Sequence, residues 1–224
     1  MGDIHRLIAF DLDGTLIDSR QDLAESANQL LGELGAAPLS VDAITRMVGE
    51  GARVLVQRAL AAAGLEEGPK ALPRFLEIYD TRLLNHTTVY DGVVDAVRIA
   101  RQHARVAVLT NKPAQPSERI LEGLRIRDLF DELIGGDGAF GRKPDPAGLL
   151  ALMGSTGATA DRTLMIGDSA IDHETARRAA VQCCLTAYGY GYETFPAERL
   201  TGDEWVVTSA QELCAAIARF AAQK

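Results

Sequence analysis

Residues 7–16 have the sequence LIAFDLDGTL, and this stretch decides the fold. Its four apolar residues, 7–10, are followed at once by Asp11, Asp13 and Gly14. A short apolar run that ends abruptly in polar and turn residues is typical of a buried parallel β-strand. We therefore expect a parallel sheet, with reactive side chains at the carboxyl end of its first strand.

The residues that follow this strand change to a helical pattern. Apolar side chains recur at helical spacing in three segments, which cover about residues 20–34, 48–63 and 69–84. Beyond residue 88, predicted strands alternate with helices; the strands lie at residues 105–109, 133–134, 163–166, 184–187 and 205–207. Such alternation indicates an α/β fold with a doubly wound parallel sheet. We predict a core of residues 1–16 and 88–224, with a small α-helical domain, residues 17–87, inserted after the first strand.

The charge and the cysteines restrict the partners and the compartment. The net charge of −8 and the pI near 5.0 argue against nucleic acid or an anionic membrane as a partner. No signal peptide or membrane-spanning run is recognisable, and the three cysteines form no even framework. We expect a cytoplasmic monomer or homodimer with free thiols. An anionic substrate would need positive charge from a few placed cations or a metal.

Four segments that are distant in sequence carry polar residues at predicted strand ends. Asp11 and Asp13 follow the first strand, and Thr110 and Asn111 follow the strand at 105–109. A further loop carries Lys143, and the strand at 163–166 is followed by Asp168 and, within the next helix, Asp172. In open α/β sheets, ligands bind outside the carboxyl ends of the strands. We expect these residues to converge on one site.

The residue types in this set suit phosphoryl transfer. Crowded carboxylates repel one another and favour a hard divalent cation, and Mg²⁺ takes carboxylate, water and phosphate oxygens. A carboxylate can attack phosphorus and form an acyl phosphate, while a second one protonates the leaving group and then activates water. The Thr110 hydroxyl and the Lys143 ammonium can hold phosphate oxygens. The predicted partner is a small phosphorylated metabolite.

These segments, in this order, resemble the four motifs of the haloacid dehalogenase superfamily, and the resemblance covers essentially the whole chain. It implies that Asp11 is the nucleophile and Asp13 the acid/base. It also implies that Thr110, Asn111 and Lys143 bind substrate. The resemblance gives the metal ligands as a set: Asp11, the main-chain carbonyl of Asp13, Asp168 and Asp172. Asp172 is left open, as a ligand, as a neighbour of the ligands or as a residue favoured in the first turn of a helix. The helical insert is similar to the small α-helical cap of that superfamily.

Within the superfamily, the sequence resembles the phosphoglycolate phosphatase group. The dehalogenase branch lacks an aspartate at the position of Asp13, so we set dehalogenation aside. Glu50 and Arg53 lie in the insert segment expected to face the site, where Arg53 could bind a substrate carboxylate; a solvent-facing arginine is the alternative. Phosphoglycolate is the favoured substrate. The alternatives are a broad-specificity sugar-phosphate, nucleotide or pyrophosphate phosphatase, a phosphomutase, and a non-catalytic phosphate-binding module.

Overall fold

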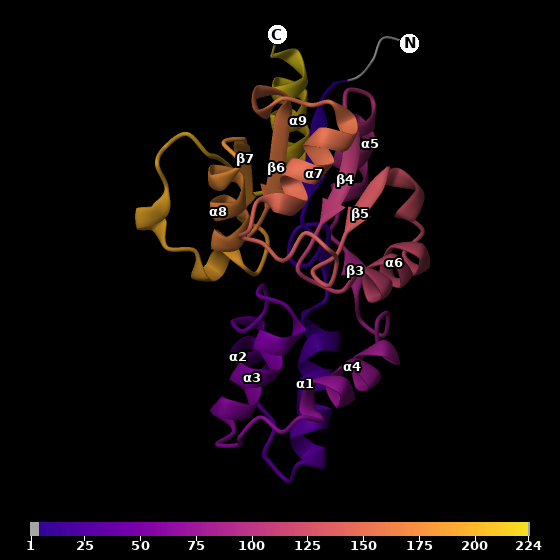
Figure 1. Ribbon diagram of the computed structural model, residues 1–224, viewed down its shortest axis with the longest axis vertical. Coiled ribbons are helices and arrows are strands. Elements are labelled where there is room, and N and C mark those ends of the chain that lie inside the picture. The colour runs from indigo at the N-terminus through magenta and orange to yellow at the C-terminus, as the bar shows by residue number, and fades with distance from the viewer. Residues whose placement is uncertain (1–4, 224) are drawn as a thin grey trace.

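The computed structural model describes residues 5–223 and contains a six-stranded sheet in which every pair of neighbours is parallel (Figure 1). In spatial order the strands are β5 (Glu132–Ile134), β4 (Arg105–Leu109), β1 (Leu7–Phe10), β6 (Thr163–Gly167), β7 (Gln182–Thr186) and β8 (Trp205–Val207). The first strand of the chain is thus central, between β4 and β6. This arrangement confirms the predicted α/β class and its parallel sheet.

Helices cover both faces of the sheet, which makes it doubly wound (Figure 1). The covering helices are α5 (Val93–Arg101) and α9 (Ala210–Ala222) on one face, α7 (Ala147–Thr156) and α8 (Ala170–Arg178) on the other, and α6 (Ala114–Gly123) beside β5. Because side chains alternate along a strand, Ile8 and Phe10 pack in the core under α5 and α9. Leu7 and Ala9 pack in a second core under α7 and α8.

Four helices form a separate group beyond the sheet, which we call the helical lobe (residues 20–80; Figure 1). They are α1 (Arg20–Glu33), α2 (Val41–Thr45), α3 (Ala52–Ala62) and α4 (Ala71–Asp80). The chain leaves the core through β2 (Ile17–Asp18) and returns through β3 (Thr88–Val89), and these two short strands pair antiparallel. The division into residues 17–87 and the remainder stays a prediction, and the ladder of β2 and β3 lies at its boundaries.

Several boundaries differ from the predicted ones for local reasons. The helix α3 begins at Ala52 and not near residue 48, because Gly49 and Gly51 have φ angles of 120° and 89°, which no helix contains. The helix α6 begins at Ala114 and includes Pro116, which the first turn tolerates because its N–H groups have no helical partner. The short helix α2 was not predicted.

Single turns of 3₁₀ helix complete the described part: η1 (Arg127–Leu129), η2 (Ala160–Arg162), η3 (Tyr192–Thr194) and η4 (Ala197–Arg199). Within residues 5–223, no helix combines the length and the apolar character needed to cross a membrane.

Candidate active site

The predicted site residues meet at the carboxyl ends of three adjacent strands. Asp11 directly follows β1, and its N–H donates to the carbonyl of Ile166 at 2.8 Å, which extends the ladder by one residue. Because β1 pairs with both β4 and β6, the residues that follow those strands lie on either side of Asp11. Asp11, Thr110, Lys143, Asp168 and Asp172 line one cavity between the sheet and the helical lobe.

Three buried carboxylates form the centre of this cavity. One oxygen from each of Asp11, Asp168 and Asp172 lies within 4.8 Å of the others. The ammonium of Lys143 bridges two of them, with Nζ 2.6 Å from Asp11 Oδ1 and 2.5 Å from Asp172 Oδ1. Burial raises the pKa of Asp11 to about 7, against the opposing effect of Lys143 and with a further contribution from Asp172. One lysine therefore does not balance the three carboxylates.

This charge imbalance fits a divalent cation. Burial, and then the charges of Asp172 and Asp11, raise the pKa of Asp168 well above its usual range. Asp168 uses Oδ2 to accept the Gly191 N–H at 2.7 Å. Asp172 has both oxygens engaged, since Oδ2 accepts the Ser169 hydroxyl at 2.6 Å and Oδ1 contacts Lys143. The donor set is oxygen-only, as Mg²⁺ prefers, with Asp11 and Asp168 better placed to bind it than Asp172.

The turn after β1 is built closely around Asp168. Gly14 has a φ of 90°, and a Cβ on it would lie 1.9 Å from Asp168 Oδ2. A side chain at this position would therefore be strained by the backbone and would displace the carboxylate. This close approach explains why glycine follows Asp13.

Asp13 lies at the side of the cavity and is held by two partners. Lys112 Nζ lies 2.9 Å from its Oδ1 and 2.8 Å from its Oδ2, and the Ser19 hydroxyl donates to Oδ1 at 2.5 Å. The side chain of Asp13 keeps 12% of its surface exposed, and that of Lys112 keeps 5%. Asp13 is thus held at the wall of the cavity, and its side chain is about as exposed as that of Asp11, which keeps 11% of its surface.

Thr110 and Asn111 connect the end of β4 to the rest of the site. The Thr110 hydroxyl accepts the Lys112 N–H at 3.2 Å and lines the cavity. The side-chain amide of Asn111 donates to the carbonyls of Gly49 and Lys143, each at 2.9 Å. Asn111 therefore ties the lobe segment before α3 to the loop that carries Lys143.

The wall that the helical lobe contributes is mostly apolar. The cavity has about 730 Å³ of atom-free space, part of it open to solvent. On the lobe side it is lined by Leu23, Val48, Gly49, Gly51, Ala52, Leu55, Phe75, Leu76 and Tyr79. Among the described residues that line it, the cations are Lys112 and Lys143, and both come from the core. The lobe thus adds no positive charge to the site.

Comparison with known proteins is consistent with this geometry. The model of the haloacid dehalogenase-like hydrolase family matches residues 8–186, which include all four motif segments. The chain belongs to this family. It is 43% identical over 197 residues to the phosphoglycolate phosphatase of Rhodospirillum rubrum, covering 84% of this chain and 82% of that protein. It is 41% identical over 199 residues to the phosphoglycolate phosphatase of Pseudomonas putida KT2440, covering 85% and 72%.

A solved structure shares the whole arrangement. The crystal structure of a predicted phosphoglycolate phosphatase from Haemophilus somnus 129PT superposes with a TM-score of 0.86 at 30% identity, covering 94% of this chain and 97% of that one. The family recognised from the four motifs is thus confirmed, and the chain is an enzyme of the hydrolase class.

Two predicted substrate-binding residues of this family member lie outside the cavity. The side chain of Arg53 is 55% exposed and is 3.5 Å from Glu67. The side chain of Glu50 is 45% exposed and forms an ion pair with Arg58. Neither is among the residues that line the cavity. The prediction expected the insert segment that carries Glu50 and Arg53 to face the site. Gly49, Gly51 and Ala52 of that segment do line the cavity, but the two charged side chains form ion pairs outside it.

Several residues that line the cavity were not predicted as site residues. Among them are Lys112, Tyr79 and Tyr190. Lys112 follows Thr110-Asn111 at a strand end, a position that could have marked it. Tyr79 and Tyr190 come from α4 and from the loop after β7, and no local pattern in the sequence distinguishes them from core aromatics.

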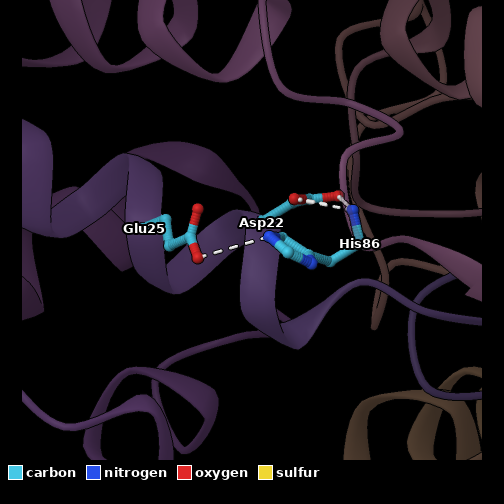
Figure 2. A group of neighbouring side chains, drawn as sticks. All are labelled: Asp22, Glu25 and His86. Atoms are coloured by element: carbon cyan, nitrogen blue, oxygen red, sulfur yellow. Dashed lines mark hydrogen bonds and ion pairs between the residues drawn. The ribbon is translucent and has the colours of Figure 1, made fainter.

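A second group of titratable residues, Asp22, Glu25 and His86, joins the lobe to the return segment (Figure 2). The carboxylate of Asp22 is fully buried and accepts the N–H of His86 and both the N–H and the hydroxyl of Thr87, at 2.7–3.1 Å. Glu25 Oε1 lies 3.4 Å from His86 Nε2. Because these donors already occupy the carboxylate oxygens of Asp22, we interpret the group as a structural connection and not as a metal site.

Proposed function

We propose that this chain hydrolyses a small phosphomonoester with Mg²⁺, through an aspartyl-phosphate on Asp11. The observation that carries the proposal is the buried cluster of Asp11, Lys143 and Asp168, with the carboxylate of Asp13 lining the same cavity. The names of the relatives support phosphatase chemistry. Mg²⁺, held by Asp11, Asp168 and the main-chain carbonyl of Asp13, would neutralise the carboxylates and the phosphoryl oxygens.

The residues of the chain divide the reaction into two steps. In the first, a carboxylate oxygen of Asp11 attacks phosphorus, the ester P–O bond breaks, and the carboxyl group of Asp13 gives its proton to the departing oxygen. In the second, Asp13 takes a proton from a water that attacks the phosphorus of the intermediate, and Asp11 leaves. Lys143 and the Thr110 hydroxyl hold the phosphoryl oxygens throughout. The products are an alcohol and inorganic phosphate.

The substrate that we propose is 2-phosphoglycolate. The relatives that share about 40% of the sequence carry the name phosphoglycolate phosphatase. The cavity lies between the sheet and the helical lobe, which we infer acts as a cap over it. We also infer a cytoplasmic location, which the three free cysteines support.

The test is phosphate release from a panel of small phosphorylated compounds, ranked by kcat/KM. The panel contains 2-phosphoglycolate, pyrophosphate, a nucleoside monophosphate and glucose 6-phosphate. Asp11→Asn is expected to reduce phosphate release from every one by at least about a thousandfold, while circular dichroism shows an intact fold. Substantial turnover by this variant would refute the covalent route, and a preference for another ester would replace phosphoglycolate as the substrate.

A further inference from the structure

We propose that Lys112 and Tyr79 bind a carboxylate on the leaving group, and so select phosphorylated 2-hydroxy acids over uncharged esters. This inference rests on the proposed phosphatase function and adds the residues that would determine its specificity. Lys112 is not part of the four motifs, and its side chain is almost completely buried in the cavity. A buried ammonium needs anionic partners, and this one has been placed beside Asp13.

Lys112 lies next to the place that the leaving group of the substrate would occupy. An oxygen that receives a proton from Asp13 must come within about 3 Å of that carboxyl group. Lys112 Nζ is already 2.8 Å from Asp13 Oδ2 and 2.9 Å from Oδ1. A carboxylate separated from the ester oxygen by a single carbon therefore comes to rest beside Nζ. An ester of an uncharged alcohol has no anionic group on its leaving group that could pair with this ammonium.

Tyr79 completes the subsite from the lobe. Lys112 Nζ lies 4.8 Å from the centre of the Tyr79 ring, a cation–π contact. The Tyr79 hydroxyl is buried, and its proton has no acceptor among residues 5–223, because the nearby Lys112 ammonium can only donate to it. A buried hydroxyl whose proton has no acceptor is costly, and a bound carboxylate oxygen would satisfy it. Burial also raises the pKa of Tyr79 to about 12, which keeps the hydroxyl a donor.

The rest of the cavity leaves few other ways to recognise a second anionic group. Lys143 is occupied by Asp11 and Asp172, on the side where the phosphoryl group reacts. The lobe residues around Tyr79 are apolar, such as Leu55 and Phe75. Arg53, the cation expected from the sequence, lies outside. Lys112, which pairs with the proposed acid Asp13, is therefore the cation within the cavity that lies on the side of the leaving group.

The experiment compares two esters that differ in the carboxylate. Phosphate release from 2-phosphoglycolate and from ethyl phosphate is measured with Mg²⁺, and the ratio of the two kcat/KM values is the readout. Lys112→Met is expected to lower this ratio about tenfold to a hundredfold, the loss of a charged hydrogen bond. Any disturbance of Asp13 slows both esters and cancels in the ratio. Tyr79→Phe is expected to lower the ratio about threefold to tenfold.

Two control variants test whether the change in the ratio comes from the charge of Lys112 at this position. Lys112→Arg keeps the charge and should retain most of the preference, and Lys70→Met, an exposed lysine of the lobe, should leave it unchanged. An unchanged ratio in Lys112→Met overturns the proposal. If that variant does not fold, Tyr79→Phe decides, and an unchanged ratio there overturns it equally.

A binding measurement distinguishes failure of this inference from failure of the proposed function. The affinities of Asp11→Asn for phosphoglycolate and for ethyl phosphate are measured by calorimetry, with and without Lys112→Met. A preference for phosphoglycolate that disappears with Lys112→Met supports the subsite even if the wild-type chain releases no phosphate. The same preference in both backgrounds overturns the subsite, whatever the chain hydrolyses.

Discussion

Replacing Asp22 by alanine is expected to destabilise the protein by about 3 kcal/mol. The carboxylate of Asp22 accepts the N–H of His86 (Figure 2). It also accepts the N–H and the hydroxyl of Thr87, which makes three donors in all. Asp22 has no exposed surface and Thr87 has 4%, so water cannot easily replace the lost acceptor. A buried donor left without a partner costs ~1–3 kcal/mol, and the low end of that range for three donors gives the estimate.

The assay is urea unfolding followed by far-ultraviolet circular dichroism. The free energies of unfolding are compared between variants whose dependence on urea concentration, the m value, is the same. Glu25→Ala is the matched control, one turn further along α1. Its carboxylate lies 2.8 Å from Arg82 and 3.4 Å from His86, but these pairs are partly exposed, so the loss should stay below about 1 kcal/mol. Amide exchange at residues 86 and 87 should accelerate only in Asp22→Ala.

The reasoning is refuted if Asp22→Ala costs no more than Glu25→Ala. That result would show that the return segment is held by other contacts and that the buried carboxylate contributes little. A large loss in Glu25→Ala would point instead to the contacts of Glu25 with Arg82 and His86 as the main connection.

Three further results are expected. Chelation with EDTA should abolish phosphate release and added Mg²⁺ should restore it, whereas activity that survives metal removal would contradict the oxygen-ligand site. Gly14→Ala should lower the affinity for Mg²⁺ about tenfold or more, because its Cβ would displace Asp168. The readout is the Mg²⁺ concentration that gives half-maximal activity, and an unchanged value would argue against that contact. Ala180 has a φ of 55°, so Ala180→Gly should raise the melting temperature by about 2–4 °C, while Ala179→Gly, at a φ of −84°, should lower it.

The central part of the fold could be predicted because its signals are local. The apolar run before Asp11 and the alternation of strands and helices after residue 88 depend on short stretches of sequence. The helix boundaries near Gly51 could not be predicted as easily, since apolar periodicity continues through residues 48–52 while the backbone turns. A glycine with positive φ ends the helical pattern, and apolar periodicity does not show which glycine adopts that conformation.

The site shows the same limit. The meeting of Asp11 and Asp168 could be expected because both follow strands of a parallel sheet, whose carboxyl ends share one edge, although the direct pairing of β1 with β6 was not predicted. The direction of Arg53 could not, because half a turn of rotation about a helix axis separates a side chain in the cavity from one in solvent. Lys112 was overlooked for a related reason: its importance comes from a contact with Asp13, which is distant in sequence.

The ladder of β2 and β3 has a consequence for how the chain assembles. The central strand β1 must pair with β4, as in the register of Leu7 with Arg105, across the entire lobe. Closing so long a loop costs chain entropy. Since Asp18 pairs with Thr88, a folded lobe returns the chain to the point where it departed and shortens the segment that still has to close. An insert whose two ends meet in this way can be exchanged for another of different size without changing the order of the strands.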